Sequence, residues 1–434
     1  MPLRPRTSPL TAPGSGLNPS RAVLANGAVV IAKETRTIPA VTINLAIRAG
    51  SVCDPADAPG AMFLLSRVID RGTASRSAAD IADELDNRGI TLSLNVARHL
   101  FSIACTCLSE DVDEVFALMG DIVMSPTFPE AQLAIRKAEV ITAIRQDDDN
   151  PAVRAVESLM TLLYPGHPYG RRIKGSADVV SHLSRERLAA LHAVRFAPSM
   201  LSAVVVGDVP TQRAMDLAAR EFGSWVAPAP AAVPISRPTP VVSRQRLVIP
   251  MLNKAQADVA YGFLAVSRSD PGYYAASVMN NILGQYAMGG RLGDSIRERQ
   301  GMAYYAFSSL DANVAEGPLV VRAGIGPENV DRAVASIDEE IGRFAREGAT
   351  AKELQESQQY LIGSMPRALE TNAAIAVFLQ TAELFGLGLD YDLHLPERLR
   401  AVTLNEVNEA AARLLDPARA TVVIAGPYED PGVG

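Results

Sequence analysis

The sequence predicts an α+β fold made of two homologous domains, each a mostly antiparallel sheet packed with long helices. Two observations predict this fold. Residues 184–207 and 403–426 share one order of features: helix, proline, β-branched strand and glycine. A stretch rich in proline and alanine lies between them and is typical of an extended linker. We therefore expect two similar domains that face each other as a clamshell.

The clearest part of the repeat is its last helix and strand. Each copy opens on a residue suited to cap a helix, Ser184 or Thr403, and continues through an amphipathic pattern. Each copy then reaches a proline, enters a β-branched run and stops at Gly207 or Gly426. The capping residues, prolines and glycines all recur at the same offset, which indicates a duplicated unit.

Earlier segments repeat more loosely. Residues 257–271 echo residues 40–55 as an apolar strand followed by a loop and Asp-Pro. Residues 292–307 echo residues 81–95 as a helix closed by glycine and followed by a strand. The repeat continues toward the start of each domain.

These patterns divide the chain into an N-terminal domain at 20–226, a linker at 227–243 and a C-terminal domain at 244–434. In the C-terminal domain, residues 327–347 and 351–370 are predicted as two long helices. A cleft between two such domains suits a peptide, although the architecture alone identifies no substrate.

Composition excludes several classes of function. Hydrophobic residues make up 48% of the chain, charged residues 21%, and the net charge is −7. Because no dense cluster of Lys and Arg occurs, we expect no nucleic-acid binding. The sequence has neither an apolar signal region near its start nor a run long enough to span a bilayer. We therefore expect no membrane contact and a cytoplasmic location.

The cysteines and histidines form no metal-binding pattern. Cys105 and Cys107 lie two residues apart on one strand face, where both are expected to be small buried hydrophobic residues. With Cys53 they are too few for a disulfide framework. The histidines form neither His-Glu-x-x-His nor His-x-x-Glu-His. They are His99, His167, His182, His192 and His394.

Several motifs are similar to those of the M16 family of zinc peptidases, which includes pitrilysin and the mitochondrial processing peptidases. The resemblance covers nearly the whole chain. It is carried by ANGAVVIAKE (25–34), Arg-Gly-Thr (71–73), HPYGRRIKGS (167–176) and IRERQGMAYYAFSS (296–309). The family holds zinc with the two His of His-x-x-Glu-His and a Glu from a later helix, and the Glu of the motif is the general base.

This chain differs from the family at every one of those positions. The resemblance places Phe63 and Arg67 at the two His positions, Ser66 at the base and Ala143 at the distal Glu. Phe, Ser and Ala are not zinc ligands of this kind, and Arg67 brings a fixed positive charge. We therefore expect degenerate zinc positions and no metal or other cofactor in this chain.

A second group of residues in this chain, Arg297 and Tyr304, lies around a predicted chain reversal. The helix at 289–299 ends near Gly301, where the chain reverses into a strand, so Arg297 and Tyr304 flank the reversal. If the aromatic pair on the other strand face, Tyr305 and Phe307, faces the core, Tyr304 faces the cleft. From the residues alone, Arg297 also suits a helix C-terminus and Tyr304 a core edge. The resemblance implies that the pair holds the substrate backbone and assists catalysis.

The resemblance therefore implies a non-zinc subunit of a heteromeric M16-type metallopeptidase, inactive alone. A homologous partner carrying His-x-x-Glu-His would form a heterodimer with this chain and supply zinc, and the ligand would be an extended peptide. The alternative is an inert structural or peptide-holding M16-like core subunit. A self-sufficient peptidase of another mechanism lacks support, because neither a Gly-x-Ser-x-Gly motif nor a Cys–His nucleophile pairing occurs.

Overall fold

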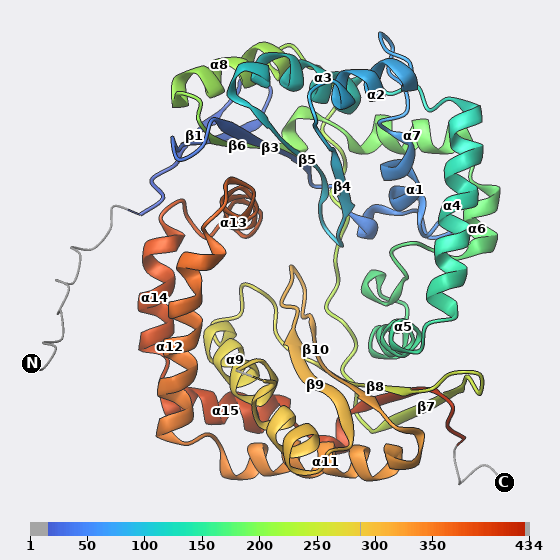
Figure 1. The fold of residues 1–434 in the computed structure, drawn as a ribbon, viewed down its shortest axis with the longest axis vertical. Coiled ribbons are helices and arrows are strands. Elements are labelled where there is room, and N and C mark those ends of the chain that lie inside the picture. The colour runs from blue at the N-terminus through green and yellow to red at the C-terminus, as the bar shows by residue number, and fades with distance from the viewer. Residues whose placement is uncertain (1–15, 287, 430–434) are drawn as a thin grey trace, which may run out of the picture.

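A computed structural model of the chain describes residues 16–286 and 288–429. Within these ranges the chain forms two halves, each a β-sheet with helices on its outer face (Figure 1). The two sheets face each other across the middle of the molecule. The predicted α+β class with two similar, mostly antiparallel domains is confirmed. No helix in the described part of the chain combines the length and the apolar character that a bilayer span requires.

The first sheet has six strands in the order β1-β2-β6-β3-β5-β4, and its neighbours are antiparallel except for β2 and β6. Its strands are β1 (Ser20–Val23), β2 (Val29–Glu34), β3 (Ala40–Ile47), β4 (Ser93–Val96), β5 (Phe101–Leu108) and β6 (Leu201–Gly207). The helices of this half are α1 (Ala61–Val68), α2 (Ala78–Asp86), α3 (Val112–Met124), α4 (Glu130–Asp148), α5 (Pro151–Leu163), α6 (Ala177–His182), α7 (Arg185–Arg195) and α8 (Thr211–Phe222).

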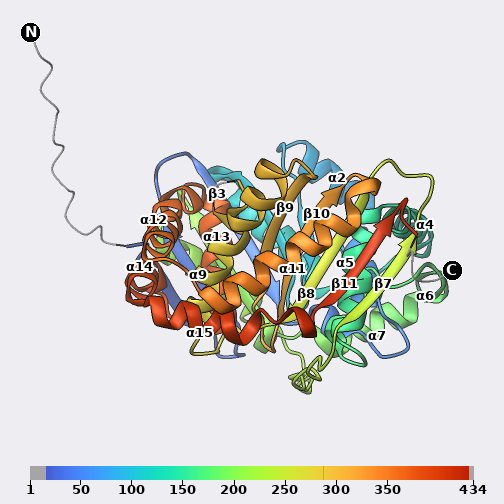
Figure 2. The ribbon, with the colours of Figure 1, turned by 90° about the horizontal axis from the view of Figure 1, so that it is seen from below.

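The second sheet has five strands in the order β7-β11-β8-β10-β9, with β7 and β11 parallel. Its strands are β7 (Gln245–Pro250), β8 (Ala257–Leu264), β9 (Ala303–Leu310), β10 (Pro318–Ile325) and β11 (Thr421–Gly426). The helices are α9 (Tyr273–Asn280), α10 (Gly290–Leu292), α11 (Val330–Glu347), α12 (Ala351–Ala368), α13 (Asn372–Phe385), α14 (Tyr391–Ala401) and α15 (Leu404–Leu414). Asn281–Gln285 and Gly293–Arg299 are π-helical. Figure 2 shows α11 lying across the outer face of this sheet.

The glycines that close the repeat are required by close packing. Gly207 and Gly426 end β6 and β11 with φ of 149° and 142°. A Cβ atom at Gly207 would lie 2.3 Å from the carbonyl oxygen of Ala40, at the start of β3. A Cβ atom at Gly426 would lie 2.5 Å from Cα of Ala257, at the start of β8. The two halves thus use glycine at the same place for the same steric reason.

Each half gives one helix to the sheet of the other half. Helix α5 packs on β8 and β11 of the second sheet, and α13 packs on β3 and β6 of the first sheet. Figure 1 shows both helices on the inner sides of the sheets. Buried Leu159 and Leu163 of α5 lie against Gly262 of β8, where a Cβ atom would be 2.8 Å and 3.0 Å from them. The halves are therefore interlocked and not joined by the linker alone.

Polar contacts reinforce this junction. His99 Nε2 of the first half lies 2.5 Å from the hydroxyl of Tyr169, and that hydroxyl accepts a hydrogen bond from the amide of Ala315 at 3.1 Å. His167 Nδ1 accepts a hydrogen bond from the Tyr169 amide, and His167 Nε2 lies 3.0 Å from the carbonyl oxygen of Ser236 in the linker region. The HPYG segment therefore fixes the first half to both the linker and the second half.

Protonation of His99 is expected to weaken the fold in acid. Burial, with the charge of Arg98, lowers the pKa of His99 to about 4 from 6.5. The unfolded chain therefore binds more protons as the pH falls, and the contribution of neutral His99, complete above about pH 6.5, is lost as the pH approaches 4. The free energy of unfolding, measured in urea across this range, should fall more for the wild type than for His99→Gln. Parallel curves for the two proteins would contradict this expectation.

Candidate functional site

Helix α1, which carries three of the predicted degenerate zinc positions, begins at a tightly built turn. Gly60 precedes it with a φ of 94°, and a Cβ atom there would lie 2.5 Å from the carbonyl oxygen of Lys174. The buried carboxylate of Asp54 accepts hydrogen bonds from the amides of Gly60 at 2.8 Å and Met62 at 2.7 Å. Burial raises the pKa of Asp54 to about 7, although these two bonds and Arg171 oppose the shift.

Phe63, Ser66 and Arg67 lie on this short helix. Phe63 and Arg67 are one turn apart on the same face, and the guanidinium carbon of Arg67 lies 4.7 Å from the centre of the Phe63 ring. Ser66 is buried, and its hydroxyl donates to the carbonyl oxygen of Phe63 at 2.6 Å. An arginine and an aromatic ring therefore cover the face where the resemblance expects two imidazoles.

The fourth position, Ala143, lies half-buried on α4, which packs against α1. The four side chains together supply no imidazole, thiolate or carboxylate, and these are the donors that zinc requires. Across residues 16–286 and 288–429, no three His, Cys, Asp or Glu side chains are grouped to hold a metal ion. The three cysteines are free and buried. The residues at this place do not fit a zinc ion.

The predicted reversal at Gly301 is present in the second half. The π-helix Gly293–Arg299 ends there, Gly301 has a φ of 63°, and its amide donates to the carbonyl oxygen of Arg297 at 3.0 Å. The side chain of Arg297 is 38% exposed and lies 3.8 Å from Glu298. Tyr304, at the start of β9, is 69% exposed. Both predicted residues thus present accessible side chains on either side of one reversal.

The orientation of Tyr304 depends on which face of β9 meets the helices of its own half. Ala306 and Ser308 are the buried residues of β9, and the Ser308 hydroxyl donates to the carbonyl oxygen of Asn280 in α9. Tyr305 and Phe307 instead lie on the inner face of the sheet, beside α5. Tyr304 shares the face of Ala306 and Ser308 but is itself 69% exposed. Alternation separates the faces of a strand but does not say which face meets the helices.

Glycines bring the segment before Arg297 directly onto β9. A Cβ atom at Gly284 would lie 2.3 Å from the amide nitrogen of Ser308, and one at Gly289 would lie 2.3 Å from the carbonyl oxygen of Ala306. At Gly293 a Cβ atom would lie 2.2 Å from the carbonyl oxygen of Met288. Backbone therefore packs on backbone along this segment, and the position of the π-helix relative to β9 is fixed.

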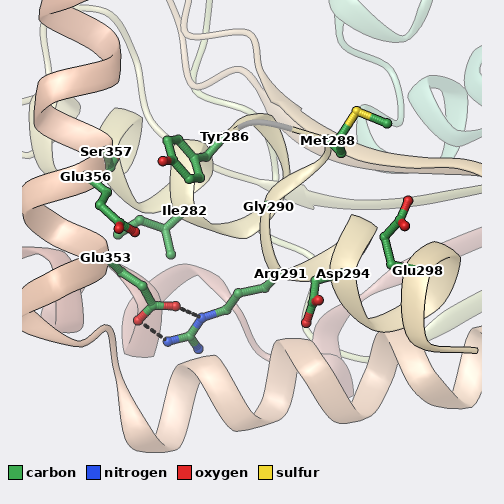
Figure 3. A pocket seen from close by; sticks show the side chains of 10 residues that line it. All are labelled: Ile282, Tyr286, Met288, Gly290, Arg291, Asp294, Glu298, Glu353, Glu356 and Ser357. Atoms are coloured by element: carbon green, nitrogen blue, oxygen red, sulfur yellow. Dashed lines mark hydrogen bonds and ion pairs between the residues drawn. The ribbon is translucent and has the colours of Figure 1, made fainter.

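A pocket of about 360 Å³ opens beside the same π-helix (Figure 3). Arg291 donates two hydrogen bonds to the carboxylate of Glu353 in α12, at 2.6 and 2.8 Å. Burial raises the pKa of Glu353, but hydrogen bonds from Arg291 and Thr350 outweigh it and lower the pKa to about 2. Glu298, the neighbour of Arg297, also lines the pocket. The ion pair ties α12 to the glycine-containing segment.

The sequence indicated Arg297 and Tyr304 but not the pair that anchors their surroundings. The pattern Thr-x-x-Glu at 350–353 is a recognisable capping box, and the structure contains it. The second role of Glu353, as the partner of Arg291, has no local signal because the two residues belong to separate elements. The pairing becomes visible only when α10 and α12 are placed together.

Comparison with known proteins agrees with this architecture. Residues 29–177 match the family described as insulinase (peptidase family M16). Residues 182–361 match the family described as peptidase M16 inactive domain. Together the two matches span most of the chain.

Relatives and solved structures cover nearly the same extent. A protein of Mycobacterium tuberculosis named an uncharacterized zinc protease is 28% identical over 98% of this chain and 96% of its own length. One of Helicobacter pylori named a non-peptidase homolog is 23% identical over 88% of this chain and 87% of its own length. A crystal structure of a peptidase M16 inactive domain from Pseudomonas fluorescens aligns with a TM-score of 0.87 and 27% identity, covering 96% of this chain and all of that one. The chain belongs to the M16 peptidase family.

Proposed function

We propose that this chain is the zinc-free subunit of a heteromeric M16-type metallopeptidase. A homologous partner with His-x-x-Glu-His carries the metal, and this chain presents Arg297 and Tyr304 to an extended peptide. The observation that carries the proposal is a contrast between the two halves. The first half has residues unfit for zinc chemistry at the three ligand positions and at the base position, whereas the second half has an accessible Arg/Tyr pair.

The chemistry of the pair suits a peptide bond under attack. A guanidinium donates parallel hydrogen bonds and can hold a substrate carbonyl in one orientation. A phenol donates to the carbonyl oxygen as that oxygen gains negative charge, which stabilises the transition state more than the bound substrate. Neither task requires Arg297 or Tyr304 to contact the metal.

The names of the relatives do not decide whether this chain binds zinc, so that assignment depends on its own residues. The relative in Mycobacterium tuberculosis is named a zinc protease, and the relative in Helicobacter pylori is named a non-peptidase homolog. Membership of the family is therefore compatible with a zinc-binding protease and with a homolog that is not a peptidase. Phe63, Ser66, Arg67 and Ala143 favour the condition without zinc, because their side chains lack the required donors.

An inert structural or peptide-holding subunit is the second candidate. The accessible guanidinium and phenol beside Gly301 favour a role in catalysis, since a scaffold has no need of either group at that place. The two functions predict different behaviour on addition of the partner.

Mixing the chain with a homologous His-x-x-Glu-His subunit from the same genome tests the proposal. Cleavage of a quenched fluorescent peptide should be absent for this chain alone and should appear or rise strongly in the mixture. Hydrolysis by the isolated chain would contradict the proposal. A mixture no faster than the partner alone would favour the inert subunit.

Metal analysis gives a separate prediction. After dialysis against a chelator and reloading with zinc, the partner should retain one ion per chain and this chain should retain no stoichiometric zinc, because Arg67 places a cation at the ligand position. Emission spectrometry of the two separated chains measures this. A variant of the partner that lacks its second motif histidine is the matched control. Stoichiometric zinc in this chain would remove its assignment as the zinc-free subunit.

A further inference from the structure

Both halves build a small cavity on the inner face of the second sheet. It has a volume of about 350 Å³. Helix α5 supplies Val153 and Val156, β9 supplies Tyr305 and Phe307, and β10 supplies Arg322. The Tyr305 and Phe307 rings lie 5.7 Å apart and form an aromatic wall opposite the two valines. The cavity therefore has largely apolar walls with one cationic side chain, Arg322, and one anionic side chain, Glu157.

Arg322 has no counter-ion in the described part of the chain. No hydrogen bond or ion pair joins its guanidinium to residues 16–286 or 288–429, and its Nε is buried and unpaired. Arg322 lies directly opposite Phe307 in the β9–β10 ladder, so both side chains lie on the inner face. An anion that enters the cavity would gain a charged partner in this guanidinium.

The other polar side chains of the cavity have partners elsewhere or carry the opposite charge. Glu157 also lines the cavity, and its carboxylate forms an ion pair with Arg172, whose Nε lies 2.7 Å from it. The Tyr305 hydroxyl donates to the carboxylate of Asp258, which fixes the ring as a wall. Among the lining residues, Arg322 is therefore the side chain that can donate to a ligand, and its guanidinium matches a carboxylate in geometry and charge.

We infer that this cavity binds a carboxylate-bearing residue of a peptide. The aliphatic part of that residue lies between α5 and the aromatic wall, and its carboxylate pairs with Arg322. The inference deepens the proposed function and rests on it for the peptide nature of the ligand. The carboxylate comes from an acidic side chain or from the peptide C-terminus, and the two sources are separable by experiment.

Binding to the isolated full-length chain tests the inference. Fluorescence anisotropy is measured with short labelled peptides that carry Glu or Gln at one central position, each with a free or an amidated C-terminus. A carboxylate is expected to tighten binding on the order of tenfold, since a charged hydrogen-bonded pair is gained. A Glu preference assigns the side chain as the source, and a preference for the free C-terminus assigns the terminus.

Substitutions at Arg322 complete the test. Arg322→Gln should abolish the preference, and Arg322→Lys should keep part of it, because Lys retains the charge without the planar fork. Arg332→Gln, on the exposed face of α11, removes an equal charge elsewhere and should leave the preference intact. Thermal melting checks that each variant is folded. Equal affinity for all peptides, absence of binding, or a preference that survives Arg322→Gln would overturn the inference.

Failure of this inference is distinguishable from failure of the proposed function. Cleavage of the uncharged, amidated peptide by the two-subunit mixture depends on the proposed function but not on Arg322. If that cleavage is observed while the carboxylate preference in binding is absent, the carboxylate-binding inference is wrong and the proposed function is unaffected. If the mixture is inactive, the proposed function falls whatever the peptides show in binding.

Discussion

Arg297→Ala is expected to lower kcat/KM of the two-subunit peptidase about a hundredfold, and Tyr304→Phe by a similar factor. In the proposed function, each change removes a donor that acts on the peptide bond as charge develops. Loss of Tyr304 should appear mainly in kcat, because its hydrogen bond strengthens in the transition state. Loss of Arg297 should also raise KM, because a guanidinium on a substrate carbonyl acts in the bound state too.

Neither substitution is expected to change the stability of the folded chain. Both side chains are accessible, and substitutions at such positions usually alter the free energy of unfolding by less than about 0.5 kcal/mol. Arg299→Ala is the matched control for Arg297, because Arg299 lies on the same helix end and pairs with Asp294 at 3.0 Å. Tyr360→Phe is the control for Tyr304. Rates unchanged in both test variants would remove the pair from the catalytic machinery.

Leu163→Ala is expected to destabilise the chain by about 3 to 5 kcal/mol, and Leu159→Ala by a similar amount. Both leucines are fully buried where α5 meets Gly262 of the second sheet. Truncation leaves a cavity that the rigid β8 backbone cannot fill. The total stability of a domain is about 5 to 15 kcal/mol, so the double variant should approach complete loss of the interlocked state.

Urea unfolding followed by tryptophan fluorescence and by circular dichroism measures this effect. Leu162→Ala on the same helix is the control. It should lower the free energy of unfolding by less, because Leu162 is only partly buried. If the packing of α5 on the second sheet holds the two halves together, the halves should also unfold in separate steps in the double variant. An unshifted midpoint for Leu163→Ala would show that α5 does not contribute to the stability of the junction.

Much of the fold was predictable because its signals are local. Helices α11 and α12 lie within the predicted ranges 327–347 and 351–370, since an amphipathic period and a capping box specify them. Gly89 and Gly301 both have positive φ at the ends of helical segments, as the repeat indicated. The burial of Cys105 and Cys107 on one face of β5 followed from strand alternation.

The candidate site was predictable in part for the same reason. The placement of Phe63, Ser66 and Arg67 on one helix and of Ala143 on a neighbouring helix follows the sequence pattern, and their assignment as degenerate zinc positions stays a prediction. The orientation of the Tyr305 and Phe307 face was not predictable, because strand alternation left it open. Both faces of β9 are covered, one by helices of its own half and the other by α5.

The sequence by itself determined the two-domain α+β plan, the repeat and the reversal between Arg297 and Tyr304. Only the tertiary structure decided that α5 and α13 cross to opposite sheets, that Arg291 binds Glu353, and that Arg322 lies unpaired in a cavity shared by both halves. The reason is physical. Capping, periodicity and backbone conformation depend on neighbours in the chain, whereas packing and ion pairing depend on which distant elements meet.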